Sequence, residues 1–334
     1  MSRPCCPALA LTVPVAAGVS IACLALALFC LDAASFAAAQ SPTFSRAVQE
    51  PITPVPAAPA QDPRRVALGE QLFQDRRLSH DSTHSCLSCH DTRTNGASAN
   101  VRDLTPQGQP LTLNTPTIFN IALNFRLNWE GNVRSLRREA EEGLSNPATM
   151  ASSVDEVLAR LQTDPEIVGR FRDAYGRGPD RDNLLDAIVS FERSLNTPGG
   201  RFDRWLEGEV GAITQEELSG YQLFKSLGCI SCHQGVNVGG NLFQRHGIFH
   251  PLGTPEPELV RVPSLRNVAT TAPYFHDGSA ATLSEAVKAM GVAQLDRALT
   301  GEEVGAIVAF LNTLTGIYKG APVTSAGAPN GAPP

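Results

Sequence analysis

Two copies of the pattern Cys-x-x-Cys-His constrain this chain more than any other feature of its sequence. They occupy residues 86–90 (CLSCH) and 229–233 (CISCH). Two thiols three residues apart on a helical turn can each bond to one vinyl group of the same porphyrin, and the histidine that follows can ligate the iron. A zinc ribbon or a redox pair of cysteines is the alternative, but neither explains why a histidine follows both pairs. The pattern therefore predicts two haem c groups, held by Cys86, Cys89 and His90 and by Cys229, Cys232 and His233.

The length and composition suit a globular protein of two ordinary domains. The chain has 334 residues, of which 42% are hydrophobic, and a formal net charge of -6. These values disfavour a disordered chain, and no basic stretch indicates a nucleic-acid partner. A mildly acidic surface is compatible with docking of a basic electron-donor protein, although the same balance is common.

The N-terminal segment predicts export. Arg3 precedes an uncharged apolar run over residues 8–31, and small residues before Gln40 offer a cleavage site after Ala39. We therefore expect residues 1–39 to be a signal peptide and the mature protein to be periplasmic. The apolar run is long enough to cross a bilayer, so an uncleaved membrane anchor is the alternative. Four of the eight cysteines lie in this segment and four in the two motifs, which leaves none for a disulfide framework.

Proline content and apolar patterning divide the rest of the chain. Residues 40–63 are rich in proline, which predicts a tether, and residues 320–334 predict a disordered tail. A Pro-Gly-Gly break at residues 198–200 separates an N-terminal haem domain, residues 64–199, from a C-terminal haem domain, residues 200–319. The similar sequences LGEQLF and GYQLF precede the two motifs and indicate an internal repeat.

Helical periodicity dominates both domains, and the expected fold class is all-α. Capping boxes open three of the expected helices, at Ser153 and Glu156, at Thr282 and Glu285, and at Thr300 and Glu303. Met290 shares the apolar face of the second of these helices, where it is either a core residue or the second axial ligand of the C-terminal haem iron. His246 and His250 lie in a loop rich in Gly and Pro; either could ligate iron, but a solvated loop histidine is the more frequent case.

Seven further motifs follow one another in a recognisable order. They are residues 68–79 (LGEQLFQDRRLS), 113–117 (LNTPT), 128–131 (NWEG), 146–147 (NP), 202–204 (FDR), 263–267 (PSLRN) and 271–278 (TAPYFHDG). Together with the haem motifs they resemble the bacterial di-haem cytochrome c peroxidase family, whose superfamily includes the di-haem enzyme that matures tryptophan tryptophylquinone. The resemblance covers nearly all of the expected mature chain and implies two cytochrome c-like domains, each with one covalently bound haem c.

The resemblance implies different roles for the two haems. The haem at residues 86–90 looks like the peroxidatic one, and the haem at residues 229–233 looks like the electron-transfer one. Met290 falls where the family's peroxidases place an axial methionine, and Trp129 matches a tryptophan between the haems that can relay an electron. The positions that match calcium ligands at the domain interface are Asn114, Thr271 and Pro273.

Three departures from the family's pattern concern the first haem. No histidine lies between residues 91 and 114, where the family's peroxidases carry a capping ligand, so we expect an iron already open to peroxide. Thr149 stands where the family has an acid-base glutamate, and a hydroxyl cannot take up a proton at neutral pH. Glu139 aligns with the family's nearby glutamine and is the expected catalytic substitute, unless it is a solvated carboxylate; Glu141 and Glu142 are less favoured.

Three functions remain open at this point. The first is an exported peroxidase that reduces hydrogen peroxide to water, with electrons from a cytochrome c or cupredoxin passing through the C-terminal haem and Trp129 to the N-terminal haem. The second is a high-valent di-haem enzyme that oxidises a residue on a partner protein, and the third is a di-haem electron-transfer cytochrome. The missing glutamate favours the second or third, and Met290 favours the first or third, because the quinone-maturing relative has tyrosine there. We expect the first function, and the sequence leaves a homodimer open.

Overall fold

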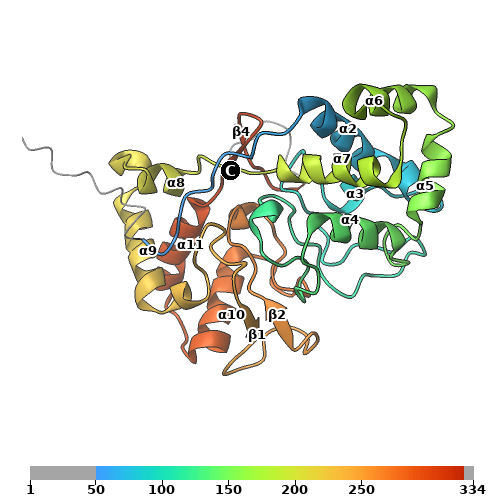
Figure 1. Cartoon of the computed structure of the whole chain (residues 1–334). Helices are drawn as coiled ribbons and strands as arrows, with labels where there is room; N and C mark the ends of the chain where they lie inside the picture. Colours follow the sequence, from blue (N-terminus) through green and yellow to red (C-terminus); the bar gives the residue numbers. More distant parts are fainter. Residues whose placement is uncertain (1–49, 327–334) are drawn as a thin grey trace, which may run out of the picture. The chain divides into compact units, whose positions relative to one another are not determined.

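The computed structural model describes residues 50–326. The expected signal peptide or membrane anchor, the beginning of the expected tether and the end of the expected tail lie outside the described residues. Within the part described, no helix is both long and apolar enough to cross a membrane. Helices dominate this part of the chain (Figure 1).

The helices fall into an earlier and a later group along the sequence. The earlier group comprises α2 (Pro63–Gln74), α3 (Cys86–Cys89), α4 (Leu136–Ser145), α5 (Val154–Leu161), α6 (Pro165–Tyr175) and α7 (Arg181–Arg193). The later group comprises α8 (Arg201–Leu206), α9 (Gln215–Ser226), α10 (Leu283–Leu295) and α11 (Gly301–Asn312). Short 3-10 turns join them at η2 (Arg76–Leu78), η3 (Ile121–Leu123), η4 (Val210–Ala212), η5 (Cys229–Ser231) and η6 (Val268–Thr270).

The all-α expectation is wrong in one detail, because four short strands are present. Strand β1 (Phe243–Arg245) pairs antiparallel with β2 (Leu259–Arg261), and β3 (Ile317–Tyr318) pairs antiparallel with β4 (Ala321–Pro322). Strands of two or three residues are too short to show an alternating pattern in a sequence. The fold is therefore helical with few strands.

The internal repeat appears as the same helix crossing used twice. Helix α2 packs on α7 and α9 packs on α11 (Figure 1). At the first crossing Gly69 lies against the carbonyl of Ala187 and the Cβ of Phe191, and no larger side chain fits there. At the second crossing Gly220 lies in the same way against residues 306 and 310, which are again alanine and phenylalanine. The repeat predicted from the sequence is thus confirmed as a structural one.

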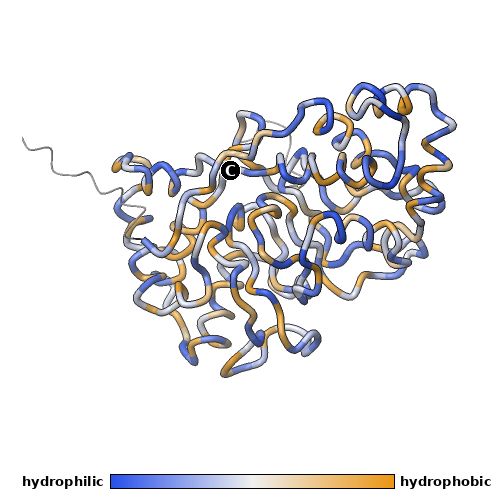
Figure 2. Tube along the Cα trace, viewed as in Figure 1, coloured by the Kyte–Doolittle hydropathy of each residue, from blue (hydrophilic) through white to orange (hydrophobic). Residues whose placement is uncertain are grey.

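Each crossing supports its own apolar core. Figure 2 shows hydrophobic and hydrophilic residues alternating along most helices, as amphipathic packing requires. The first core includes Leu68, Leu72, Leu161, Phe171 and Leu184, and the second includes Phe202, Tyr221, Val304, Phe310 and Leu311. The three expected capping boxes open α5, α10 and α11, and these predictions are confirmed.

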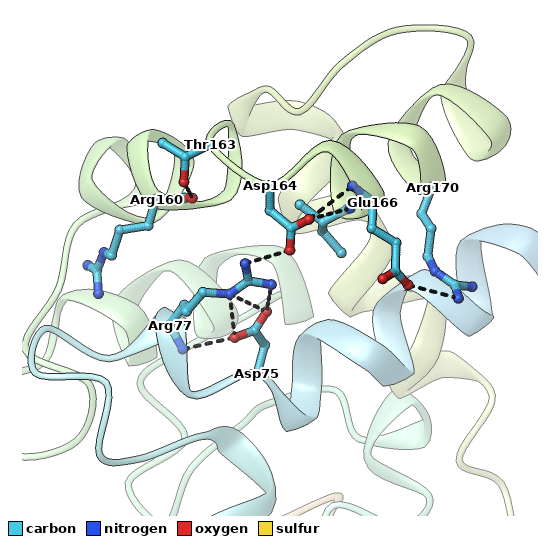
Figure 3. Close-up of polar contacts among 8 residues, drawn as sticks. Asp75, Arg77, Arg160, Thr163, Asp164, Glu166 and Arg170 are labelled. Carbon is cyan, nitrogen blue, oxygen red and sulfur yellow. Dashed lines mark hydrogen bonds and ion pairs between the residues drawn. The ribbon is translucent and has the colours of Figure 1, made fainter.

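Ion pairs hold the short segment that connects α2 to the first motif. Arg77, just after α2, binds Asp75 at 2.6 Å and Asp164 at 2.8 Å (Figure 3). Asp164 also caps α6, since its side chain accepts from the backbone N–H of Glu166 at 2.9 Å. One arginine therefore links the end of α2 to the start of α6.

The expected tether is wrong for its described part, because this segment packs on the protein. Ile52 and Val55 are 0% and 3% exposed. The carbonyl of Thr53 accepts from Arg266 Nη2 at 2.7 Å, and the Glu50 carboxylate accepts from the Tyr221 hydroxyl at 2.6 Å. The prolines restrict the backbone to extended conformations, so a few buried apolar side chains suffice to order it.

The disordered tail expected over residues 320–334 includes residues that are in fact ordered. Strand β4 pairs with β3, and Val323 is 2% exposed, with its N–H donating to the Gly316 carbonyl at 3.1 Å. A single apolar residue among Gly, Pro and Ala gave no periodic signal. Order therefore extends beyond residue 320.

Candidate functional site

The two motifs form short turns of the same design. Residues 86–89 form the one-turn helix α3, and residues 229–231 form the 3-10 turn η5. In each, the backbone N–H of the histidine donates to the carbonyl of the first cysteine, at 2.9 Å for His90 and 3.0 Å for His233. The turn thereby places both thiols and the imidazole around one position, as attachment of a single porphyrin requires.

Both motif histidines are held in one orientation by the loop that follows. Nδ1 of His90 lies 3.2 Å from the Gly96 carbonyl, and Nδ1 of His233 lies 3.2 Å from the Val238 carbonyl. Since a carbonyl only accepts, each Nδ1 carries a proton and Nε2 keeps its lone pair. Burial lowers the pKa of His90 and lowers the pKa of His233 to about 4. Both imidazoles are therefore neutral, which is the form that ligates iron.

All four motif cysteines are free of disulfides. Burial raises the pKa of Cys89 to about 12 and that of Cys229 to about 11, and it also raises the pKa of Cys86. Among residues 50–326, no group of three or more His, Cys, Asp or Glu side chains could hold a metal ion. The two cysteine pairs thus do not combine into the four-cysteine site considered as the alternative.

A cavity of about 580 Å³ adjoins the second motif. Cys229, Cys232 and His233 line it together with Met290 from α10. Its remaining walls are largely apolar, including Leu265, Val287, Ile307 and Leu311. An apolar cavity with two free thiols and a neutral imidazole fits a haem c.

Trp129 lines the same cavity and is fixed at both ends of its ring. Its indole N–H donates to the Asn114 carbonyl at 2.8 Å, and its ring meets that of His276 edge-on at 6.3 Å. His276 in turn lies 4.3 Å from the ring of His246. No sequence pattern predicts this run of three rings, because they come from distant segments.

The two loop histidines have partners other than solvent. Both ring nitrogens of His246 face carbonyls, that of Leu252 at 3.0 Å and that of Pro257 at 2.7 Å. His250 Nε2 lies 2.7 Å from Asp296 Oδ1. Since these nitrogens are engaged, the suggestion that either histidine ligates iron gains no support.

The three residues expected to bind calcium line one cavity. Asn114, Thr271 and Pro273 all line the cavity beside Trp129. The Asn114 amide nitrogen donates to the carbonyls of Asn100 and Val101, at 3.2 and 3.1 Å, so its side-chain oxygen points elsewhere. Amide and carbonyl oxygens are ligands that calcium accepts. The geometry is compatible with the expected site.

Near the first motif, Glu139 on α4 faces a second carboxyl group that the sequence did not single out. Glu192 on α7 is 4% exposed, and its Oε2 has no hydrogen-bond partner in the described structure. Burial, and then repulsion from Glu142, raises the pKa of Glu139 to about 7. Burial, and then repulsion from Glu139, raises the pKa of Glu192 well above its usual value. Glu192 stands four residues after Ile188 on an apolar stripe, a pattern that could have revealed it.

The other acid-base candidates are engaged. The Thr149 hydroxyl donates to the Gly143 carbonyl at 2.8 Å. Glu141 pairs with Arg181, and Glu142 pairs with Arg138 at 2.5 Å. Glu139 has no hydrogen bond or ion pair of its side chain within residues 50–326, so it is the candidate with a free carboxyl group.

Comparisons with known proteins agree with this geometry. The sequence model of di-haem cytochrome c peroxidases matches residues 63–211, and the cytochrome c model matches residues 218–315. The cytochrome c551 peroxidase of Nitrosomonas europaea is 39% identical over 285 residues, which cover 81% of this chain and 85% of that protein. The methylamine utilization protein MauG of Methylorubrum extorquens is 31% identical over 245 residues, 69% of each chain.

Solved structures share the fold. The crystal structure of a MauG-like protein associated with microbial copper homeostasis matches with a TM-score of 0.66 and 27% identity, covering 78% of this chain and 93% of that one. The matched family implies two haem c groups, and the turns, histidines and cavity described above fit such groups. The chain therefore belongs to the di-haem cytochrome c peroxidase family and is a peroxidase-type oxidoreductase.

Proposed function

We propose that this protein reduces hydrogen peroxide to water, with one peroxide, two electrons and two protons giving two water molecules. The observation that carries the proposal is a Glu139 carboxyl group near Cys86 of the first motif, without a hydrogen-bond or ion-pair partner among the described residues, in the same region as a neutral and anchored His90. Bound haem supplies the iron that takes up peroxide and passes electrons to it.

The residues of the first motif would hold one haem. Cys86 and Cys89 would form its thioether bonds, and His90 Nε2 would be free to ligate the iron because Nδ1 is engaged by Gly96. The loop after the motif contains no histidine up to residue 114, so it offers no imidazole to cap the iron.

Glu139 would move the proton. A carboxyl group with a pKa near 7 is half ionised at neutral pH, so it can take a proton from one peroxide oxygen and return it to the other. Trp129 belongs to the electron route instead, because an indole in contact with the second cavity can relay an electron between the haems.

The second motif would hold the electron-transfer haem. Cys229, Cys232 and His233 would attach and ligate it, and Met290, which lines the same cavity, would supply a thioether ligand. A methionine ligand raises the reduction potential relative to two histidines, which suits a group that stores an electron. A calcium ion at Asn114, Thr271 and Pro273 completes the proposed ligands, with water in the remaining positions.

The cellular setting follows from the same proposal. The protein is exported to the periplasm, where a small cytochrome c or cupredoxin gives it electrons, and residues 1–39 are removed or remain as a membrane anchor. Residues 64–199 form the peroxidatic domain and residues 200–319 the electron-transfer domain. A homodimer remains part of the proposal.

Stopped-flow spectroscopy of the holoprotein tests the activity. We expect hydrogen peroxide to change the Soret band rapidly, and reduced cytochrome c or cupredoxin to be oxidised in fast turnover. No change in the Soret band with peroxide contradicts the proposal and leaves only electron transfer between two haems.

Oxidation of a residue on a partner protein is the second candidate. It is favoured by the engaged Thr149 hydroxyl, which cannot replace the family's glutamate, and by the missing capping histidine. A rapid spectral change with peroxide but no oxidation of a small donor would favour it over peroxide reduction.

A further inference from the structure

Arg261 is a buried arginine at the second cavity. It lies at the end of β2, is 6% exposed and lines the cavity that adjoins Cys229 and His233. Its backbone N–H donates to the Trp129 carbonyl at 2.7 Å, and its Nε donates to the Asn128 carbonyl at 3.1 Å. These two bonds fix the guanidinium at the cavity wall.

The guanidinium lacks a counter-charge from the chain. Within residues 50–326, Arg261 forms no ion pair, and its Nη1 is buried without a hydrogen-bond partner. Burial lowers the pKa of Arg261 to about 10, so the group is still charged at neutral pH. A buried charge without a partner is strongly unfavourable. The position therefore needs an anion that residues 50–326 do not supply.

Arg266, five residues later, shows how this fold satisfies a buried arginine. It is 2% exposed, and it donates to Asp203 Oδ1, to the Val236 carbonyl and to the Thr53 carbonyl, each at 2.7 Å. Arg245, at the same cavity as Arg261 but exposed, pairs with Glu258 at 2.8 Å. Arg261 differs from both because it lacks an acidic partner.

We infer that Arg261 binds a carboxylate in this cavity, a propionate of the haem held by Cys229, Cys232 and His233. The propionates are the anionic groups of a haem, and a guanidinium matches a carboxylate in shape and charge. The inference rests on the proposed haem at the second motif and does not depend on peroxide reduction. A small carboxylate or other anion from solution has the same chemistry and is the other source to be distinguished.

This contact would act on the haem and on Trp129 together. A positive charge beside a propionate favours the reduced haem and so raises its reduction potential. Because the Arg261 N–H also holds the Trp129 carbonyl, the same residue fixes the segment that carries the indole. Arg261 is in this sense a positioning residue for the electron route.

The test uses the full holoprotein and three variants. Arg261→Gln removes the charge, and Arg261→Lys keeps the charge but cannot form the bidentate hydrogen bonds of a guanidinium. The control, Arg245→Gln, removes an exposed charge from a residue that lines the same cavity. A pyridine haemochrome assay first counts the haems. Spectropotentiometry then gives the potential of the second haem, and resonance Raman gives its propionate bending band.

We expect Arg261→Gln to shift the potential of the second haem downward and to move the propionate band. Arg261→Lys should retain most of the potential and still move the band, and Arg245→Gln should change neither. An unchanged band in both Arg261 variants, with two haems bound, overturns the inference. If Arg261→Gln loses a haem, the band of Arg261→Lys decides alone.

Added anions separate the two sources of a carboxylate. If a free anion occupies the position, the potential of the wild-type second haem will follow the concentration of added acetate or chloride at constant ionic strength. Such a dependence overturns the propionate assignment, and a constant potential supports it. Peroxide turnover is not a readout here, so a protein with the expected potentials but no peroxidase activity contradicts only the proposed function.

Discussion

Glu139 is a carboxyl group whose surroundings set its chemistry. It shares the region of the first motif with Glu192, which is buried on α7, while Glu139 on α4 is half-buried. Two carboxyl groups that repel each other hold protons more tightly than either would alone. This pair is the part of the proposed site that the family resemblance did not supply.

Replacing Glu139 by Gln should lower kcat/KM for peroxide by about 10²- to 10⁴-fold, because the proton acceptor is lost. In the wild-type protein kcat/KM should rise with pH and level off above about 7, since the base acts when ionised. Steady-state kinetics against pH measure both effects. Glu141→Gln, at a carboxylate that pairs with Arg181, is the matched control and should leave the profile unchanged.

Glu139 should also make stability depend on pH, in the opposite direction to activity. As the pH rises, kcat/KM increases, whereas the contribution of Glu139 to the free energy of unfolding decreases. The pKa of Glu139 is raised to about 7 from 4.5, so the folded protein holds this proton more tightly than the unfolded chain does. Its favourable contribution is complete below pH 4.5 and is lost as the pH rises through about 7. Glu139→Gln should therefore gain about 1–3 kcal/mol relative to wild type between pH 5 and pH 8, as measured by urea unfolding of the holoprotein. An equal difference at both pH values contradicts the raised pKa.

Met290 offers a sharper spectroscopic test. If Met290 ligates the iron as proposed, Met290→Ala should lower the potential of the second haem and convert it to high spin, because its thioether ligand is lost. Met290→Leu keeps the side-chain volume and should give the same spectrum, which separates ligation from packing. An unaltered absorption spectrum in both variants would show that the sulfur is not a ligand.

At the scale of helices, the two glycine crossings determine how each half is built. Gly69 and Gly220 let a helix approach the backbone of its partner, α7 in one case and α11 in the other. The sequence shows this as a repeated Gly ahead of Leu-Phe, and the alanine and phenylalanine that receive it are also repeated.

Gly69→Ala and Gly220→Ala should each destabilise the holoprotein by about 1–3 kcal/mol, because the new methyl group meets a backbone carbonyl. Chemical unfolding followed by circular dichroism measures the loss. Gly305→Ala on α11 is the control, since nothing lies near a Cβ there and alanine is the better helix former. A stable Gly220→Ala protein would mean that the helices can separate at no cost.

At the scale of the molecule, the segment ahead of α2 is part of the second core. Ile52→Ala should cost about 2–5 kcal/mol of unfolding free energy, because a fully buried side chain leaves a cavity. Thr53→Ala is the control, since the exposed side chain is removed while its carbonyl still binds Arg266. Equal stability of the two variants would restore the original interpretation of this segment as a tether.

The sequence was sufficient for features that repeat or are local. The two haem motifs, the capping boxes and the apolar stripes depend on neighbours in the chain, and the three helices with predicted capping boxes begin where they were expected. It was insufficient where distant segments meet. Arg261 and the ring contact of Trp129 with His276 become visible only when the helices and loops pack, because no spacing rule relates their positions.

The peptide at Asn114 has a further consequence. Its N–H donates to the His276 carbonyl at 2.7 Å while its own carbonyl receives the indole of Trp129 at 2.8 Å. Asn114 thus links the ring of Trp129 to the backbone of His276, which lies more than a hundred residues later in the chain. Any strain introduced at that amide, whether by an ion or by a substitution, would pass from the Asn114 main chain directly to the His276 carbonyl and to the Trp129 indole.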